Sequence, residues 1–329
     1  MWWLLWPAVA AAALLIAGTL LGRLLPRRHT ALAGRHVLVT GGSSGIGRSL
    51  AVLCAKQGAH VTIVARDEAR LEETKREIQA AVEGARVQCL SLDVAKDAAA
   101  VRDAIFRAEQ ELGPLYFVAC CAGFALAQRC EEMPIATHRR LMEVNYFGVL
   151  NVLHAAVPGL KARREGRIAV VTSLGGVVGL WGFTGYCASK YALVGLSHTL
   201  LQELKPYGVG VTLCYPPDTD TPGFEQENRT KPEETRLICE TAGLFPPEKV
   251  AQKLLDDVMA GNINSTVGTE GMLMTTVGLG MGPVGSAGQL AREVLLMPVF
   301  RLVVAFFHRS WDGIVRDCMR KRDESKKSE

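Results

Sequence analysis

The chain has 329 residues, 49% of them apolar, and its 37 basic and 33 acidic side chains give a net charge of +4. This length and composition allow one large α/β domain with extra segments that face a membrane. The near balance of charge gives no indication of a nucleic-acid partner. The nine cysteines lack paired C-x-x-C spacing, so we expect reduced thiols in a cytosolic compartment and neither a disulfide framework nor a metal site.

Residues 1–25 predict a membrane anchor. No charged side chain occurs from Met1 to Gly22, and a helix of that length spans about 33 Å, enough for a hydrocarbon core of about 30 Å. Basic residues follow the apolar run instead of preceding it, which favours an uncleaved transmembrane helix over the alternative, a cleaved signal peptide. The positive-inside rule then places the rest of the chain in the cytosol.

A glycine-rich turn between a strand and a helix predicts a nucleotide site. Residues 35–40 form a short apolar strand, and a helical pattern begins at Arg48. Glycine lets the backbone approach a pyrophosphate, and a helix N-terminus supplies amide hydrogens and a positive dipole end. The residues expected to bind the cofactor are Gly41, Ser43, Ser44, Gly45, Ile46 and Gly47.

Arg66 ends the second predicted strand, residues 60–65, where an NAD site usually has an acidic residue that binds the ribose 2′-hydroxyl. A guanidinium there would pair with a 2′-phosphate. Arg70 and Arg48 lie near in sequence and could add positive charge. We therefore expect NADPH and not NADH, the alternative being that Arg66 is a solvated surface residue.

Asp93 follows the third predicted strand, residues 87–92. Its carboxylate would either accept a hydrogen bond from the adenine amino group or cap the next helix, and the sequence leaves both roles open. The fourth predicted strand, residues 115–119, leads into Cys120-Cys121-Ala122-Gly123. Small residues there would leave room for the adenosine ribose.

A hydroxyl, a phenol and an amine follow in fixed order farther along the chain. Ser173 ends an apolar strand of residues 167–172, and Tyr186 and Lys190, four residues apart, share one face of a helix. Ketone reduction needs a proton donor, and an adjacent ammonium would lower the phenol pKa from its usual value of about 10. These residues predict a carbonyl-reducing site, although a lone Tyr-x-x-x-Lys pair is more often an ordinary helix-surface pair.

Strands and helices alternate through residues 33–268, which predicts an α/β domain with a Rossmann-type, doubly wound parallel sheet. A predicted helix over residues 142–158 carries Asn145 early in its apolar pattern, and residues 208–214 form the next expected strand.

These motifs together resemble the short-chain dehydrogenase/reductase family over about residues 35–265. The resemblance implies that Tyr186 is the general acid and that Ser173 orients the substrate carbonyl. It also implies that Lys190 holds the nicotinamide ribose and lowers the tyrosine pKa, and that Asn145 positions a water in the proton relay. The chain departs from the family pattern at two places. Cys120-Cys121 stands where the family usually has Asn-Asn, which puts that loop's hydrogen bonding in doubt. Pro216-Pro217 stands where Pro-Gly is usual.

Residues 179–190 and 215–232 resemble, within that family, the reductases of long-chain sphingoid ketones. This closer resemblance implies NADPH-dependent reduction of 3-ketodihydrosphingosine to dihydrosphingosine in sphingolipid synthesis, on the cytosolic face of the endoplasmic reticulum membrane. Residues 216–244 are too many for a simple turn and predict a lid over the substrate. The acidic side chains of this segment are more simply a solvated face than a site for the substrate's ammonium group.

Residues 269–310 are strongly apolar, and residues 311–329 form a charged tail. Arg301 makes a second membrane crossing costly, by about 2.5–3.5 kcal/mol if it is central. We therefore expect segments that dip into the membrane without necessarily crossing it; a cavity wall or a dimer contact is the alternative. The tail is expected to be disordered, and its last four residues resemble a dilysine retrieval signal.

Two other functions compete with reduction of a sphingoid ketone. A microsomal hydroxysteroid dehydrogenase shares the anchor, the glycine motif and the Tyr–Lys pair, but not residues 216–232 or the apolar C-terminal segments. A catalytically silent nucleotide-binding scaffold would not need the complete set of Asn145, Ser173, Tyr186 and Lys190. The sequence leaves open whether the chain forms a homo-oligomer.

Overall fold

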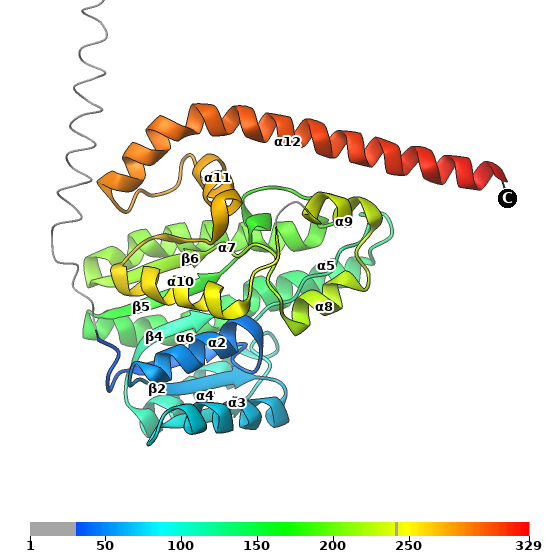
Figure 1. Cartoon of the computed structure of the whole chain (residues 1–329). Helices are drawn as coiled ribbons and strands as arrows, with labels where there is room; N and C mark the ends of the chain where they lie inside the picture. The colour runs from blue at the N-terminus through cyan, green and yellow to red at the C-terminus, as the bar shows by residue number, and fades with distance from the viewer. Residues whose placement is uncertain (1–30, 241–242, 329) are drawn as a thin grey trace, which may run out of the picture.

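The computed structural model describes residues 31–240 and 243–328 (Figure 1). The predicted anchor, residues 1–25, lies outside the described residues. Among the helices in the described ranges, none combines the length and the apolar character needed to cross a bilayer. The prediction of a transmembrane helix therefore finds no counterpart in the part of the chain that the structure describes.

A parallel sheet forms the centre of the domain, and its strand order is β3-β2-β1-β4-β5-β6-β7. The strands are β1 (His36–Thr40), β2 (His60–Ala65), β3 (Val87–Ser91), β4 (Leu115–Cys120), β5 (Gly166–Val171), β6 (Val209–Cys214) and β7 (Asn264–Ser265). The order reverses between β1 and β4, and in open α/β sheets ligands bind at that point, outside the carboxyl ends of the strands. This topology confirms the predicted doubly wound sheet.

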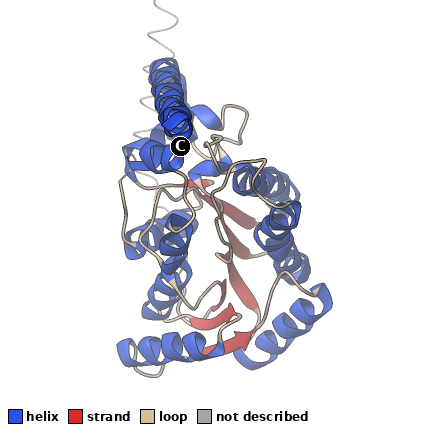
Figure 2. Cartoon of the chain, turned by 90° about the vertical axis from the view of Figure 1, so that its right-hand side faces the viewer, coloured by secondary structure: helices blue, strands red, loops and turns tan. Residues whose placement is uncertain are grey.

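Helices cover both faces of the sheet, as Figure 2 shows. Helices α2 (Gly45–Lys56), α3 (Glu68–Ala81) and α10 (Pro247–Ala260) pack on one face, and α4 (Ala98–Leu112), α6 (Gly148–Arg163) and α7 (Thr184–Leu204) on the other. Along β1, Val37 and Val39 join the first apolar cluster, while Leu38 joins the second. Strands buried on both faces need apolar side chains at successive positions, which explains the continuous apolar runs.

The expected helix over residues 142–158 is three helical segments in the structure. Helix α5 (Ile135–Met142) passes into a single π-helical turn, η2 (Glu143–Phe147), and α6 then continues to Arg163. Pro158 lies inside α6 and does not end it; the helix ends where Arg164 adopts a left-handed conformation with φ 54°. The π turn carries Asn145 and is typical of positions near functional sites.

The segment after β6 forms two short helices, α8 (Pro222–Asn228) and α9 (Glu233–Cys239), beside the end of the sheet (Figure 1). Beyond β7 lie α11 (Gly268–Gly278) and the 42-residue α12 (Ala287–Ser328), which runs across the domain over α11 and α9. The predicted disorder of the tail is therefore wrong, since its residues continue α12 through Ser328. Ion pairs one turn apart, such as Arg320–Asp317 at 2.9 Å, support the charged helix.

Candidate active site

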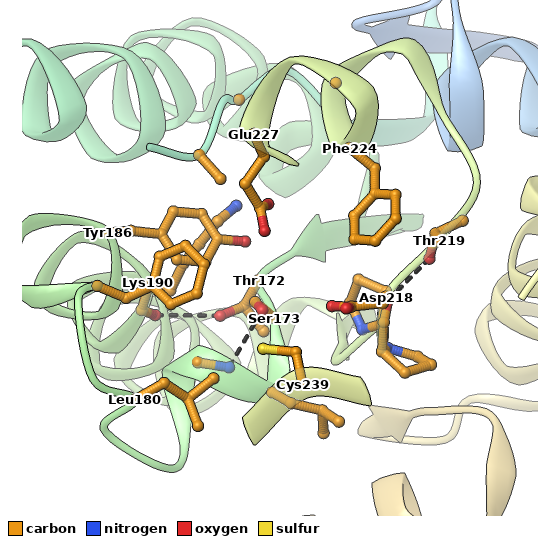
Figure 3. A pocket seen from close by; sticks show the side chains of 18 of the residues that line it. Thr172, Ser173, Leu180, Tyr186, Lys190, Asp218, Thr219, Phe224, Glu227 and Cys239 are labelled. Carbon is orange, nitrogen blue, oxygen red and sulfur yellow. Dashed lines mark hydrogen bonds between the residues drawn. The ribbon is translucent and has the colours of Figure 1, made fainter. Parts of the chain in front are cut away.

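The structure brings Ser173, Tyr186 and Lys190 together in the wall of one cavity of about 220 Å³ (Figure 3). Ser173 follows β5, and the other two side chains come from the first turns of α7. Ile46 of the glycine-rich turn lines the same cavity. The predicted nucleotide turn and the predicted catalytic side chains therefore meet at the carboxyl edge of the sheet.

Ser173 is fixed at the point where β5 ends. Its Oγ accepts a hydrogen bond from the backbone N–H of Gly175 at 3.1 Å and so caps a short 3₁₀ helix, η3 (Leu174–Gly176). The neighbouring Thr172 donates its hydroxyl hydrogen to the carbonyl oxygen of Lys190 at 3.1 Å. The bond from Thr172 ties the strand end to α7, and the bond from Gly175 fixes the serine side chain in the turn beside it.

Lys190 is 5% exposed and donates a hydrogen bond from Nζ to the carbonyl oxygen of Val171 at 3.1 Å. Its Nζ lies 5.7 Å from the centre of the Tyr186 ring. Burial disfavours the charged ammonium and lowers the pKa of Lys190 to about 8.

The pKa of Tyr186 shifts in the direction opposite to the predicted one. Burial raises it above the usual value for a phenol, the negative charge of Glu227 raises it further, and a hydrogen bond with Ser173 opposes these effects. The expectation of an acidic phenol is therefore wrong for the described structure, because burial and the charge of Glu227 outweigh the effect of the lysine ammonium. The result is a protonated phenol at neutral pH, which is the form that can donate a proton to a ketone.

Asn145 is fully buried and binds the loop that follows β4. Its Oδ1 accepts from the N–H of Phe124 at 3.0 Å, and its Nδ2 donates to the Phe124 carbonyl at 3.0 Å and to Ser189 Oγ at 2.9 Å. A Cβ at Gly123 would lie 3.1 Å from Asn145 Oδ1 and 3.4 Å from Lys190 Nζ. The amide thus positions the loop beside the lysine, and its role toward a water stays a prediction.

Thr40 supplies hydrogen bonds to the loop that lacks the family's usual asparagines. Its Oγ1 accepts from the backbone N–H groups of Cys121 at 3.1 Å and Ala122 at 3.2 Å. Burial raises the pKa of the Cys120 thiol to about 12, so this thiol is neutral and inert. Although cysteines replace the usual asparagines, backbone N–H groups of this loop are therefore hydrogen-bonded by Thr40.

The glycine-rich turn has the shape that a nucleotide needs. Gly41 and Gly45 have φ of 68° and 52°, and a Cβ at Gly47 would lie 2.3 Å from the Gly41 carbonyl oxygen. Helix α2 begins at Gly45, not at the predicted Arg48, so Ser44 is its N-cap and its first amides face this turn. The turn therefore fits the phosphates of a dinucleotide.

The arginines near the predicted adenosine site differ in whether they form ion pairs with neighbouring carboxylates. Arg66 is exposed at the end of β2. Arg70 Nε lies 3.6 Å from a carboxylate oxygen of Asp67, and Arg48 Nε lies 2.5 Å from one of Glu77. Asp93 does not cap α4, because Asp97 does so by accepting from Ala99 N–H at 2.8 Å.

Asp93 instead accepts from Ala95 N–H at 3.0 Å and from Arg140 Nη2 at 3.1 Å. The helix-cap interpretation of Asp93 is therefore wrong, and its contact with adenine stays a prediction.

Sequence reasoning missed the rest of the cavity wall because it comes from five separate segments. The charged lining residues are Asp218, Glu227 and Glu270, and the large apolar ones include Phe124, Leu180, Phe183, Phe224, Met274 and Trp311. The long connection after β6 predicts a lid; α8 and α9 supply part of the cavity wall, and their closing over a substrate stays a prediction. No local pattern in the sequence showed that Trp311, on α12, would reach the same cavity.

The sequence and the fold match known proteins. The model of the short chain dehydrogenase family matches residues 35–232. The 3-ketodihydrosphingosine reductase of Bos taurus is 44% identical over 318 residues, covering 95% of this chain and 96% of that protein. The 3-dehydrosphinganine reductase of Danio rerio is 43% identical and covers 97% of this chain and 98% of that protein.

Among solved structures, levodione reductase superposes with a TM-score of 0.68 at 24% identity, over 74% of this chain and 99% of that one, and this likeness shows the fold alone. The family model, the two relatives and the geometry of Ser173, Tyr186 and Lys190 agree. The chain belongs to the short-chain dehydrogenase/reductase family.

Proposed function

We propose that the protein reduces 3-ketodihydrosphingosine to dihydrosphingosine with NADPH, a step of sphingolipid synthesis, at the cytosolic face of the endoplasmic reticulum membrane. Membership of the family makes the protein an oxidoreductase that uses a nicotinamide cofactor. The observation that carries the substrate assignment is the match of nearly the whole chain to relatives named for this activity.

The chain's own residues support NADPH as the cofactor. The turn from Gly41 to Gly47 would hold the pyrophosphate, and the exposed Arg66 could pair with a 2′-phosphate. The cofactor, when bound, supplies the hydride that reaches the carbonyl carbon.

The three side chains at the cavity wall would handle the proton and the carbonyl. Tyr186 donates its phenol proton to the carbonyl oxygen, and Ser173 orients that oxygen by a hydrogen bond. Lys190, whose Nζ lies 5.7 Å from the phenol ring centre, favours the phenolate that forms and passes on a proton to restore the phenol. A scaffold without catalysis would not need this arrangement.

The cavity and the C-terminal helix support a lipid substrate. Aromatic and aliphatic side chains line most of the cavity, as an alkyl chain requires. Large apolar side chains on α12 are exposed: Leu290, Val294, Leu295, Val299, Leu302 and Phe306. A helix with an exposed apolar face and flanking arginines suits the surface of a bilayer.

Turnover of the full chain in microsomes tests the function. We expect dihydrosphingosine to form from the sphingoid ketone with NADPH, and product analysis by mass spectrometry would show it. Turnover of a steroid ketone without turnover of the sphingoid ketone would contradict the proposal.

The same assay tests the cofactor. NADPH should be used in preference to NADH at equal concentration, and Arg66→Ala should reduce that preference while Arg76→Ala, an exposed change on α3, should not. Preference for NADH in the unchanged protein would overturn the cofactor assignment only.

A further inference from the structure

Among the described residues, three acidic side chains line the active-site cavity. Glu227 comes from α8, Asp218 from the loop after β6 and Glu270 from α11. Figure 3 shows the Glu227 carboxylate facing the phenol of Tyr186 across the cavity. Its side chain is only 12% exposed, so this charge lies inside the pocket and not on a solvated face.

One cation is placed among these carboxylates. Lys231 Nζ lies 2.7 Å from Glu227 Oε1 and 4.0 Å from Asp218 Oδ2, and the lysine side chain is 4% exposed. A single ammonium between two carboxylates leaves one negative charge in excess. Such an excess in a buried place is unfavourable unless a further cation or hydrogen-bond donor arrives.

Glu270 shows the same need for a donor. Its Oε2 is buried and has no hydrogen-bond partner within the described part of the chain. Buried polar atoms in folded proteins nearly always have partners, so an orphaned carboxylate oxygen in a ligand cavity points to a donor on the ligand. The acidic part of the cavity wall therefore suits a cationic group that donates hydrogen bonds.

The chemistry of an amino ketone fixes where its charge must lie. In such a molecule the nitrogen sits on the carbon next to the carbonyl, about 2.5 Å from the carbonyl carbon by ordinary covalent geometry. When the carbonyl oxygen contacts Tyr186 and Ser173, the ammonium therefore lies directly beside them. Glu227 is the carboxylate that faces this position.

We propose that Glu227, with Asp218 behind it, binds the ammonium group of the substrate and makes the site selective for 2-amino ketones. This inference rests on the proposed function and adds the residue that distinguishes the substrate from a plain long-chain ketone or a steroid. Lys231 holds the two carboxylates in place, and the alkyl chain occupies the apolar part of the cavity that Trp311 and Met274 line.

Replacing one carboxylate while also changing the substrate tests this proposal. Glu227→Gln removes the charge with little change of shape, and Glu225→Gln makes the same change on an exposed residue of the same helix. Each variant and the unchanged protein are assayed with 3-ketodihydrosphingosine and with a ketone of equal length that lacks the amino group.

For Glu227→Gln we expect kcat/KM to fall at least about 30-fold with the amino ketone, mainly through KM, because a buried charge pair is lost. The ketone without the amino group should be reduced almost as before, and Glu225→Gln should change neither rate. Equal losses with both substrates would overturn the role of Glu227 as an ammonium site.

Equilibrium binding keeps the test decisive if the variant turns over poorly. Titration calorimetry with dihydrosphingosine should show a weaker affinity for Glu227→Gln than for the unchanged protein, with thermal unfolding confirming that both are folded. Unchanged affinity would also overturn the proposal. If the unchanged protein does not reduce the sphingoid ketone at all, the proposed function itself has failed.

Discussion

Tyr186 and Tyr191 stand on the same helix in different surroundings. Tyr186 lines the active-site cavity, and Tyr191 is 45% exposed. We expect Tyr186→Phe to lower kcat by about 100-fold or more, because the proton donor is removed, and to leave NADPH affinity nearly unchanged. Tyr191→Phe is the matched control and should behave as the unchanged protein. Normal turnover by Tyr186→Phe would remove this residue from the mechanism.

The protonation of Lys190 predicts how reduction depends on pH. Its pKa is lowered to about 8, so the ammonium is lost as the pH rises through about 8, whereas the raised pKa keeps the Tyr186 phenol protonated there. Activity at saturating NADPH should therefore be level below that pH and fall above it. Lys190→Arg keeps its charge at every accessible pH, so any activity it retains should show no such fall.

The lowered pKa of Lys190 also affects the free energy of unfolding, which should rise with pH where activity falls. The folded-state pKa of Lys190 lies below the ordinary value of about 10.4. The unfolded chain therefore binds more protons between about 8 and 10.4, and this group's contribution to stability rises with pH across that interval. Denaturant unfolding across this pH range, compared with Lys190→Met, measures the contribution.

How far the sequence could predict individual residues depended on their spacing. The sequence predicted the glycine turn and the side chains of Ser173, Tyr186 and Lys190, because each motif lies within a short segment whose spacing determines its geometry. Glu227 was not chosen from its acidic neighbours, since only tertiary packing shows which carboxylate enters the cavity. The predicted direction of the Tyr186 pKa shift was wrong for the same reason, because both its burial, which raises the pKa most, and the nearby charge of Glu227 arise from tertiary packing.

At the scale of elements, the strands β1 to β6 were predicted within one residue and β7 was not predicted, while helices were predicted less well. A buried parallel strand leaves a continuous apolar run, but the inserted residue that makes the π turn around Asn145 leaves no such pattern. Pro158 and Pro298 both lie inside helices that continue past them. The charged end of α12 was taken for a disordered tail because its partner, α9, lies far away in sequence.

An ion pair joins the end of α12 to the lid. Arg322 bonds Glu234 of α9, whose side chain is 1% exposed. Arg322→Ala should destabilise the folded chain by about 1–3 kcal/mol, because a buried carboxylate loses its hydrogen-bond partner. Thermal and denaturant unfolding measure this change, and faster proteolysis within α12 should accompany it.

Arg320→Ala is the control for this prediction, since Arg320 is exposed and pairs only with Asp317 among the described residues. Its effect should stay within about 1 kcal/mol. Equal stability of the two variants would show that the contact with α9 does not hold α12 in place.

For the whole molecule, the apolar face of α12 is the surface that we propose contacts the membrane. Leu302 and Phe306 are 74% and 70% exposed and lie one turn apart. In a chain that begins at residue 31, Leu302→Glu together with Phe306→Glu should weaken co-sedimentation with phospholipid vesicles by about tenfold or more.

Phe106→Glu changes an equally apolar residue that is 61% exposed on α4, away from α12, and should leave vesicle binding unaltered. Loss of binding in this control would mean that general charge, and not the face of α12, governs the interaction.

The position of Trp311 has a consequence for how the substrate reaches the active-site cavity. It stands on α12, the helix with the exposed apolar face, and it also lines the active-site cavity. A substrate dissolved in a bilayer would then enter sideways from the lipid leaflet without first desorbing into water. Turnover would follow the mole fraction of ketone in the leaflet, so adding inert phospholipid at constant total substrate would slow the reaction by surface dilution.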